Sequence, residues 1–134
     1  MIVSLDFKSE VPIYLQLRNE IIRGIGSGML SMGEKLPAVR NLAQDIGVNP
    51  MTVNKTYALL RDEGFILTDG RRGAVVISGT NTDAAYKEKL TKQMEILASE
   101  AAIKGMGEKE FLTLCENLYR KLKIKKLVPE AGIS

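Results

Sequence analysis

A single turn near the middle of the chain most limits what the chain can fold into. Gly47 follows a run with the apolar period of a helix over residues 38–46, and glycine readily adopts the positive φ that ends a helix. Close behind come Asn49, a good N-cap, and Pro50, which suits the first position of a second helix. This second helix is expected to run to Glu63. Two helices joined so tightly must cross steeply, which is the spacing of a helix-turn-helix motif, although an ordinary corner in an all-α core has the same pattern.

Apolar side chains predict three helices around one core. A further helix is expected earlier in the chain, over residues 12–26, followed by a loop at residues 29–37. In each helix the apolar residues recur with the 3.6-residue period that places them on one face. They are Tyr14, Leu17, Ile21 and Ile25 in the first helix, Val39, Leu42, Ala43 and Ile46 in the second, and Val53, Tyr57 and Leu60 in the third. We therefore expect a mainly α fold.

A small β-hairpin is expected directly after the third helix. Residues 65–68 and 74–77 are strand-like runs separated by a turn at residues 69–73. A hairpin in this position is the wing of a winged helix. Its turn carries Arg71 and Arg72, and a cationic tip suits a narrow minor groove lined with phosphates. The alternative is a solvated hairpin tip with no partner.

The C-terminal part of the chain predicts a pair of helices that lacks a core of its own. A polar linker at residues 79–83 precedes one helix over residues 84–104 and another that begins near Glu108. Their apolar stripes consist of Leu90, Met94, Leu97, Ala101, Phe111, Cys115, Leu118 and Leu122. Two helices have too little interior to bury both stripes, so we expect a second copy of the chain to cover them. The expected organisation is a winged helix-turn-helix domain in residues 1–78 and a helical dimerisation region in residues 84–134.

Composition excludes several classes of function. The chain of 134 residues has one cysteine and no histidine, so a zinc site, a Cys–His dyad and a Ser–His–Asp triad are excluded. We expect no metal, no cofactor and no enzymatic activity. Cys115 shares its stripe with Phe111 and Leu118, which favours packing over redox sensing. Nineteen basic and 16 acidic residues leave a net charge of only +3, so nucleic-acid binding must come from charges gathered on one face.

Nothing in the sequence predicts a membrane segment. No apolar run approaches the ~18 residues of a spanning helix, and the start of the chain lacks the apolar core of a signal peptide. A cytoplasmic location is expected. The basic cluster at residues 120–126 is expected to be a solvated helix end, because cations are favoured near a helix C-terminus.

Three segments of the chain resemble one known family. Residues 33–43 (GEKLPAVRNLA), 47–53 (GVNPMTV) and 63–66 (EGFI) resemble the winged-helix DNA-binding domain of GntR-family transcriptional regulators. Residues 11–17 (VPIYLQL) match the first helix of that family. The resemblance covers residues 5–78, and the short pair of C-terminal helices resembles the YtrA-like branch.

The resemblance implies a dimeric repressor that binds a (pseudo)palindromic operator, often before a transporter operon. It implies that Arg40 contacts DNA, that Thr52, Asn54 and Lys55 face the major groove, and that Gly73 lets the wing backbone approach the minor groove. Three positions depart from the family pattern. The family often has Ser at the position of Ala38 and Thr at that of Ala74, and other branches have Arg where this chain has Pro50.

Residue chemistry divides the candidate DNA surface into two roles. Asn54 can pair with adenine and Lys55 can donate to guanine, so one of them is expected to read bases, and the sequence does not decide which. Thr52 lies in the first turn of its helix, where backbone N–H groups favour phosphate. Arg40, Arg71 and Arg72 are also expected to contact phosphates. The alternative for Asn54 and Lys55 is an exposed polar face without a partner.

Two wider hypotheses complete this interpretation. The rival function is a winged helix that docks another protein and does not bind DNA, which the paired arginines of the wing disfavour. A small-molecule effector, if one exists, is expected at the junction of the two regions or at the dimer interface. The reason is that each region alone is too small for a pocket of ~300–1,000 Å³.

Overall fold

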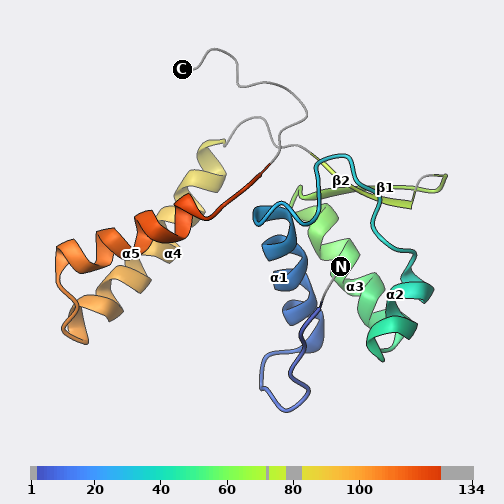
Figure 1. The fold of residues 1–134 in the computed structure, drawn as a ribbon, viewed down its shortest axis with the longest axis horizontal. Coiled ribbons are helices and arrows are strands. Elements are labelled where there is room, and N and C mark those ends of the chain that lie inside the picture. Colours follow the sequence, from blue (N-terminus) through green and yellow to red (C-terminus); the bar gives the residue numbers. More distant parts are fainter. Residues whose placement is uncertain (1–2, 72, 78–82, 125–134) are drawn as a thin grey trace. The chain divides into compact units, whose positions relative to one another are not determined.

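The computed structural model describes residues 3–71, 73–77 and 83–124. These residues form two compact units (Figure 1). One unit contains the described residues up to residue 77 together with Lys123 and Ile124, and the other contains residues 83–122. We call them the winged-helix unit and the α4–α5 unit.

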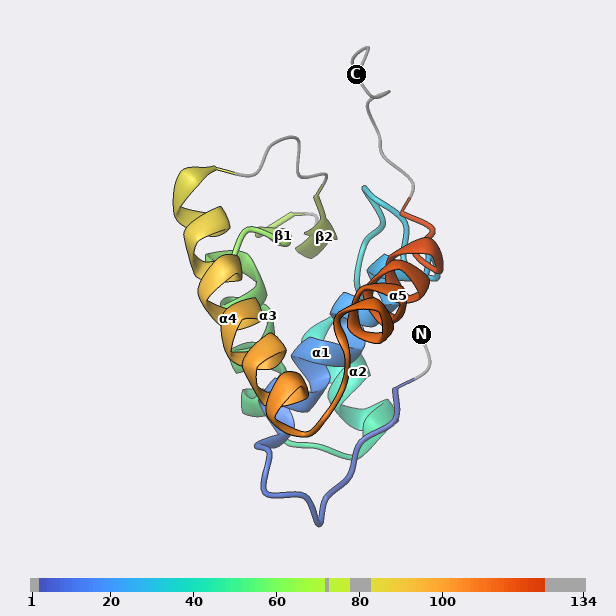
Figure 2. The ribbon, with the colours of Figure 1, turned by 90° about the vertical axis from the view of Figure 1, so that its left-hand side faces the viewer.

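The winged-helix unit contains three helices followed by a hairpin. The helices are α1 (Ile13–Gly26), α2 (Val39–Ile46) and α3 (Pro50–Asp62), and the antiparallel strands are β1 (Ile66–Asp69) and β2 (Gly73–Val76). In both views the hairpin lies at the C-terminal end of α3 (Figures 1 and 2). The predicted fold class, mainly α with a small β-hairpin in a winged helix-turn-helix, is confirmed.

Some element boundaries differ from the predictions by one residue. Pro12 and Ala38 precede α1 and α2 as their N-caps, because both have extended ψ angles, of 143° and 148°. The hairpin register pairs Ile66 with Val76 and Asp69 with Gly73, so each strand lies one residue away from the predicted run. These shifts leave the predicted order of the elements unchanged.

The turn between α2 and α3 has the predicted chemistry. Gly47 ends α2 with φ of +71°, and the N–H of Val48 donates to the carbonyl of Ala43 at 3.0 Å. The Asn49 side chain accepts a hydrogen bond from the N–H of Met51 at 2.8 Å, which satisfies one of the donors left free at the start of α3. A local backbone conformation and a local cap together place α3 across α2.

The predicted apolar faces supply much of the core. The buried residues are Leu17, Ile21, Ile25, Leu30, Leu36, Leu42, Ala43, Val53, Thr56, Tyr57, Leu60, Ile66, Ala74 and Val76. Tyr14, Val39 and Ile46 are half-buried at its edge. Thr56 is a buried polar residue that the apolar pattern does not reveal, and its hydroxyl donates to the Tyr14 carbonyl at 2.9 Å.

The segment before α2, predicted as a loop, pairs with the hairpin. Lys35 forms an antiparallel bridge with Val75. The N–H of Leu36 donates to the Ala74 carbonyl at 2.8 Å, and the N–H of Val76 donates to the Glu34 carbonyl at 2.9 Å. Residues 34–36 therefore lie antiparallel to β2 and are held there by one bridge and its flanking hydrogen bonds.

The α4–α5 unit consists of α4 (Ala84–Ile103) and α5 (Glu108–Arg120). Asp83 caps α4 by accepting a hydrogen bond from the N–H of Tyr86 at 2.7 Å. Helix α5 ends at Arg120, so the prediction that Leu122 lies on this helix is wrong. The N–H groups of Lys121 and Leu122 bond to carbonyls three residues earlier, which tightens and closes the last turn. No residue of α4 or α5 is buried.

Candidate nucleic-acid interface

Helix α3 has one face in the core and one face open. Val53, Tyr57 and Leu60 are buried, whereas Asn54 and Lys55 are exposed. Met51 lies near the start of the open face and is 75% exposed. The three-residue step from Met51 to Asn54 places these two side chains on one side of the helix. The face predicted to enter the major groove is therefore open to solvent at Asn54 and Lys55.

The two candidate base-reading residues have different surroundings. The ammonium of Lys55 lies over the Tyr14 ring, 4.0 Å from its centroid, and so turns toward α1. A cation over an aromatic face is attracted by the ring quadrupole, by about 0.5–1 kcal/mol at an exposed site. The sequence pattern does not reveal this contact, because Tyr14 is predicted only as a core residue. Asn54 is exposed on the neighbouring position.

The remaining candidates on the helices lie in first turns. Arg40 is the second residue of α2 and is exposed, and Thr52 is the third residue of α3 and is half-buried. Ala38 at the start of α2 makes no side-chain cap, so its departure from the family's Ser leaves that helix start without one. Pro50 occupies the first position of α3, where its missing N–H leaves no bond unmade.

The two candidate residues of the wing turn that the structure describes, Arg71 and Gly73, are both exposed. The N–H of Arg71 donates to the Asp69 carboxylate at 2.8 Å, which orders the start of the turn. Gly73 has φ of +74°, a backbone conformation that favours glycine. Arg72 lies outside the described residues. Ala74, the third departure from the family, is buried, so its side chain contributes to the core.

Among the described residues, the cations of this surface form no ion pair with a neighbouring acid. The ion pairs found among the described residues join Arg18 to Glu63, Arg23 to Glu20, Arg61 to Asp62, Lys92 to Glu88 and Arg120 to Glu116. None of them includes Arg40, Lys55 or Arg71. Their charges therefore remain available to an anionic ligand. Within the described ranges, no group of three or more metal-ligating side chains is found. None of the described helices is long and apolar enough to span a bilayer.

Comparison with known proteins identifies the family. The model of the bacterial regulatory proteins of the gntR family matches residues 13–76. The transcriptional repressor YtrA of Bacillus subtilis is 36% identical over 107 residues, which cover 75% of this chain and 82% of that protein. The chain belongs to the GntR family. It is thus a DNA-binding transcriptional regulator of the helix-turn-helix type, as the sequence resemblance predicts.

Solved structures support the same assignment for this GntR-family protein. The YtrA protein of Sulfolobus acidocaldarius, a GntR-family transcription factor, matches with a TM-score of 0.63 and 38% identity, over 74% of this chain and 99% of that chain. A transcriptional antiterminator from Listeria monocytogenes matches with a TM-score of 0.81 and 25% identity, over 96% and 97%. The DNA-binding domain of AraR in complex with an operator matches with a TM-score of 0.51 and 25% identity, over 57% and 95%.

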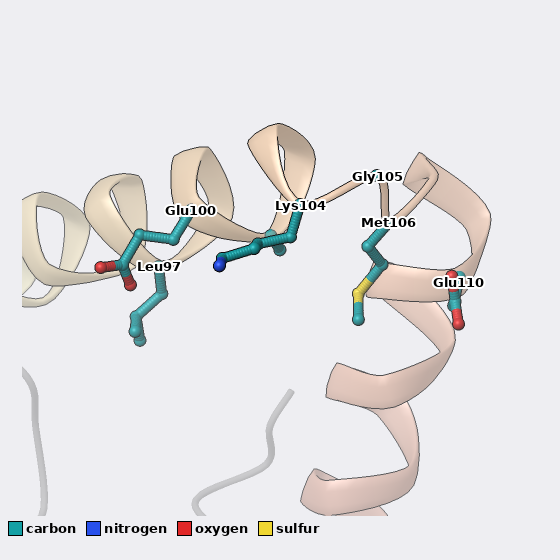
Figure 3. Close-up of a pocket in the computed structure, with 7 residues that line it drawn as sticks. Leu97, Glu100, Lys104, Gly105, Met106 and Glu110 are labelled. Carbon is teal, nitrogen blue, oxygen red and sulfur yellow. The ribbon is translucent and has the colours of Figure 1, made fainter.

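The α4–α5 unit contains an open hollow of about 530 Å³ at the corner between its helices. Leu97, Lys104 and Met106 reach into this corner (Figure 3). The hollow is open to solvent, so it is not an enclosed pocket within this unit. The helices separate after Gly105, which has φ of +99°, and this leaves the corner uncovered within the unit.

Proposed function

We propose that this GntR-family protein is a dimeric repressor that binds a (pseudo)palindromic DNA operator. The observation that carries the proposal is the open face of α3, which presents Asn54 beside cations that form no ion pair among the described residues. Two relatives support it. YtrA of Bacillus subtilis is described as a transcriptional repressor, and the AraR domain has been solved on an operator.

The contacts of this surface divide by chemistry. Arg40, Thr52 and Arg71 lie at helix starts or on a hairpin turn, where phosphates are the nearest groups of a bound duplex. Arg72 and Gly73 belong to the same wing contact. Asn54 is the base reader, because the ammonium of Lys55 is attracted toward Tyr14 while Asn54 is free to pair with adenine.

Dimerisation rests on the helices that follow the winged-helix unit. Helices α4 and α5 bury none of their residues, although their stripes contain large apolar side chains such as Leu97 and Leu118. A second copy of the chain would cover these stripes with identical ones, the arrangement of a two-fold interface. It would also close the open hollow between α4 and α5. The proposed binding site for a small-molecule effector is this dimer interface.

The proposal is tested by selecting DNA fragments from the protein's own genome with the purified full chain. A recovered fragment is then titrated beside a scrambled duplex of equal length. We expect the operator to bind at least ~10³-fold more tightly than the scrambled duplex, with affinity falling steeply as salt rises. Transcription in vitro from a promoter that carries the fragment should fall when the protein is added.

The rival function, a protein-docking winged helix, gives a different result. Such a module would enrich no fragment, and it would bind any genomic duplex as weakly as the scrambled one. A rise in transcription on addition of the protein would overturn repression while leaving DNA binding intact.

A further inference from the structure

We propose that Lys35 is a phosphate-binding residue at the base of the wing. This inference rests on the proposed DNA binding and adds a contact to it. The residue belongs to the segment between α1 and α2, which crosses to the hairpin before it reaches α2 (Figure 1). Its position in the fold, rather than the charge of the chain, distinguishes it from the other lysines.

The backbone around Lys35 is held to the hairpin on both sides. Lys35 bridges Val75, and hydrogen bonds on either side of this pair join Leu36 to Ala74 and Glu34 to Val76, at 2.8 and 2.9 Å. The backbone of this segment is therefore held against β2 in an extended, antiparallel arrangement. The backbone of Lys35 is already ordered. Binding of a phosphate therefore has to order only the Lys35 side chain.

The pleat of this extended segment directs Lys35 away from the core. Leu36, the next residue, is buried at 2% exposure, and successive side chains of a strand point to opposite faces. Lys35 lies in one row with Val75 and with Leu67, which pairs with Val75 from β1. Leu67 is 58% exposed, so this row forms the open face of the sheet.

The side chain of Lys35 runs along this face toward the wing turn. Its Cε lies 3.5 Å from the position that a Cβ on Gly73 would occupy. The ammonium is one bond further on, beside the backbone that the family resemblance places near the minor groove. Asp69, the acid opposite Gly73, already accepts the N–H of Arg71, and no ion pair of Lys35 is found in the described part of the chain.

A phosphate fits this position better than a base. The ammonium of lysine is a point charge with three donors, which suits a phosphate oxygen approached from any side. Lys35 would supply the wing with a cation whose flanking residues are hydrogen-bonded to β2, near Arg71 on the wing turn.

The test uses a fluorescein-labelled duplex of arbitrary sequence, because a phosphate contact does not depend on sequence. Binding of the full-length protein is measured as KCl is raised. Lys35→Met keeps most of the aliphatic stem and removes the charge. For each protomer that contacts the duplex, it should weaken binding roughly five- to tenfold at about 0.1 M salt and lower the salt slope by about 0.9. Lys35→Arg should restore both values.

Lys92→Met is the matched control, because it removes the same charge from an exposed position on α4. It should change neither the affinity nor the slope. If Lys35→Met melts at a lower temperature than the wild type, Lys35→Gln is measured against the same criterion. If these charge-removing variants keep the salt slope of the wild type, the proposed role of Lys35 is overturned, but DNA binding by the protein is not. A wild-type protein that shows no salt-dependent binding to DNA would overturn the proposed function instead.

Discussion

At the scale of single residues, two buried hydroxyls join α3 to the rest of its unit. Thr56 donates to the Tyr14 carbonyl of α1, and the Tyr57 hydroxyl donates to the Pro37 carbonyl at 2.7 Å. Burial raises the pKa of Tyr57 well above its ordinary value of 10.0, because the phenolate would lose its hydration. These two hydrogen bonds fix the position of α3, and with it the positions of the residues on its open face.

Tyr57→Phe should lower the free energy of unfolding by roughly 1 kcal/mol at neutral pH, since the Pro37 carbonyl loses its donor. It should also change the alkaline limb of stability. Above pH 10 the unfolded chain ionises Tyr57 while the folded chain keeps it neutral, so the wild type loses about 1.4 kcal/mol per pH unit there through this group. The phenylalanine variant lacks that loss.

Urea denaturation of both proteins at about pH 7 and about pH 11 measures this difference. Tyr119→Phe is the control, because Tyr119 is exposed and its loss should leave both values unchanged. A Tyr57→Phe variant that equals the wild type at both pH values contradicts the prediction.

Asn54→Ala should reduce operator affinity by about 1–3 kcal/mol and relax the base preference at one position in each half-site. It should leave binding to scrambled DNA nearly unchanged. Arg40→Ala should weaken both DNAs alike and lower the salt slope by about 0.9 for each bound protomer, as the loss of a phosphate contact does. Salt titrations of each variant against both duplexes separate the two roles. Equal losses on both DNAs for Asn54→Ala and Lys55→Ala would remove base reading from this face of α3.

At the scale of elements, the turn between α2 and α3 decides the direction in which α3 leaves α2. Helix α2 has eight residues and no side-chain cap, so it depends on burial of Leu42 and Ala43. Helix α3 begins with the Asn49 cap. Gly47 joins them in a left-handed conformation, with nothing within 4 Å of the position a Cβ would take. Its requirement for glycine is thus conformational.

Gly47→Ala should destabilise the protein by about 1–2 kcal/mol, because an L-residue is strained at φ of +71° even in open space. Gly47→Asn should cost less, since Asn tolerates this region better. Gly70→Ala is the matched control, with equally open space and a φ that is not positive, and it should be nearly neutral. Thermal unfolding measures all three variants. Equal melting temperatures for Gly47→Ala and Gly70→Ala would show that the turn tolerates a side chain.

At the scale of the whole molecule, the two units differ in what they bury. The winged-helix unit encloses a core that extends from Leu17 on α1 to Val76 on β2. In the α4–α5 unit, Leu97 and Leu118 remain 53% and 57% exposed. The first unit encloses a core of its own, whereas the second leaves large apolar side chains exposed within the unit.

Leu97→Asp and Leu118→Asp should convert the dimer to monomers and weaken operator binding severely, because a monomer can hold only one half-site. Binding to scrambled DNA and the helical content of the winged-helix unit should persist. Light scattering after size exclusion measures the mass. Ile103→Asp is the control, since Ile103 is exposed but lies outside the stripe of Leu90, Met94, Leu97 and Ala101. A wild-type chain that is monomeric at tens of micromolar would refute dimerisation.

The sequence by itself determined the features that depend on neighbouring residues. The helices, the Gly47 turn, the Asn49 cap and the wing hairpin follow from periodicity and capping chemistry within a few positions. The DNA-binding family follows from short motifs in the same segments. Such signals are local, so they can be recognised without knowing the tertiary structure.

Only the tertiary structure decided which distant residues meet. Thr56 bonds to a carbonyl 42 residues away, Lys55 lies over Tyr14, and Lys35 joins the wing across the whole helix-turn-helix. None of these contacts has a periodic signal, because each depends on how irregular segments bring separate elements together. The same reason separates Asn54 from Lys55, which residue chemistry treats alike: only Lys55 lies over the ring of Tyr14, on another helix.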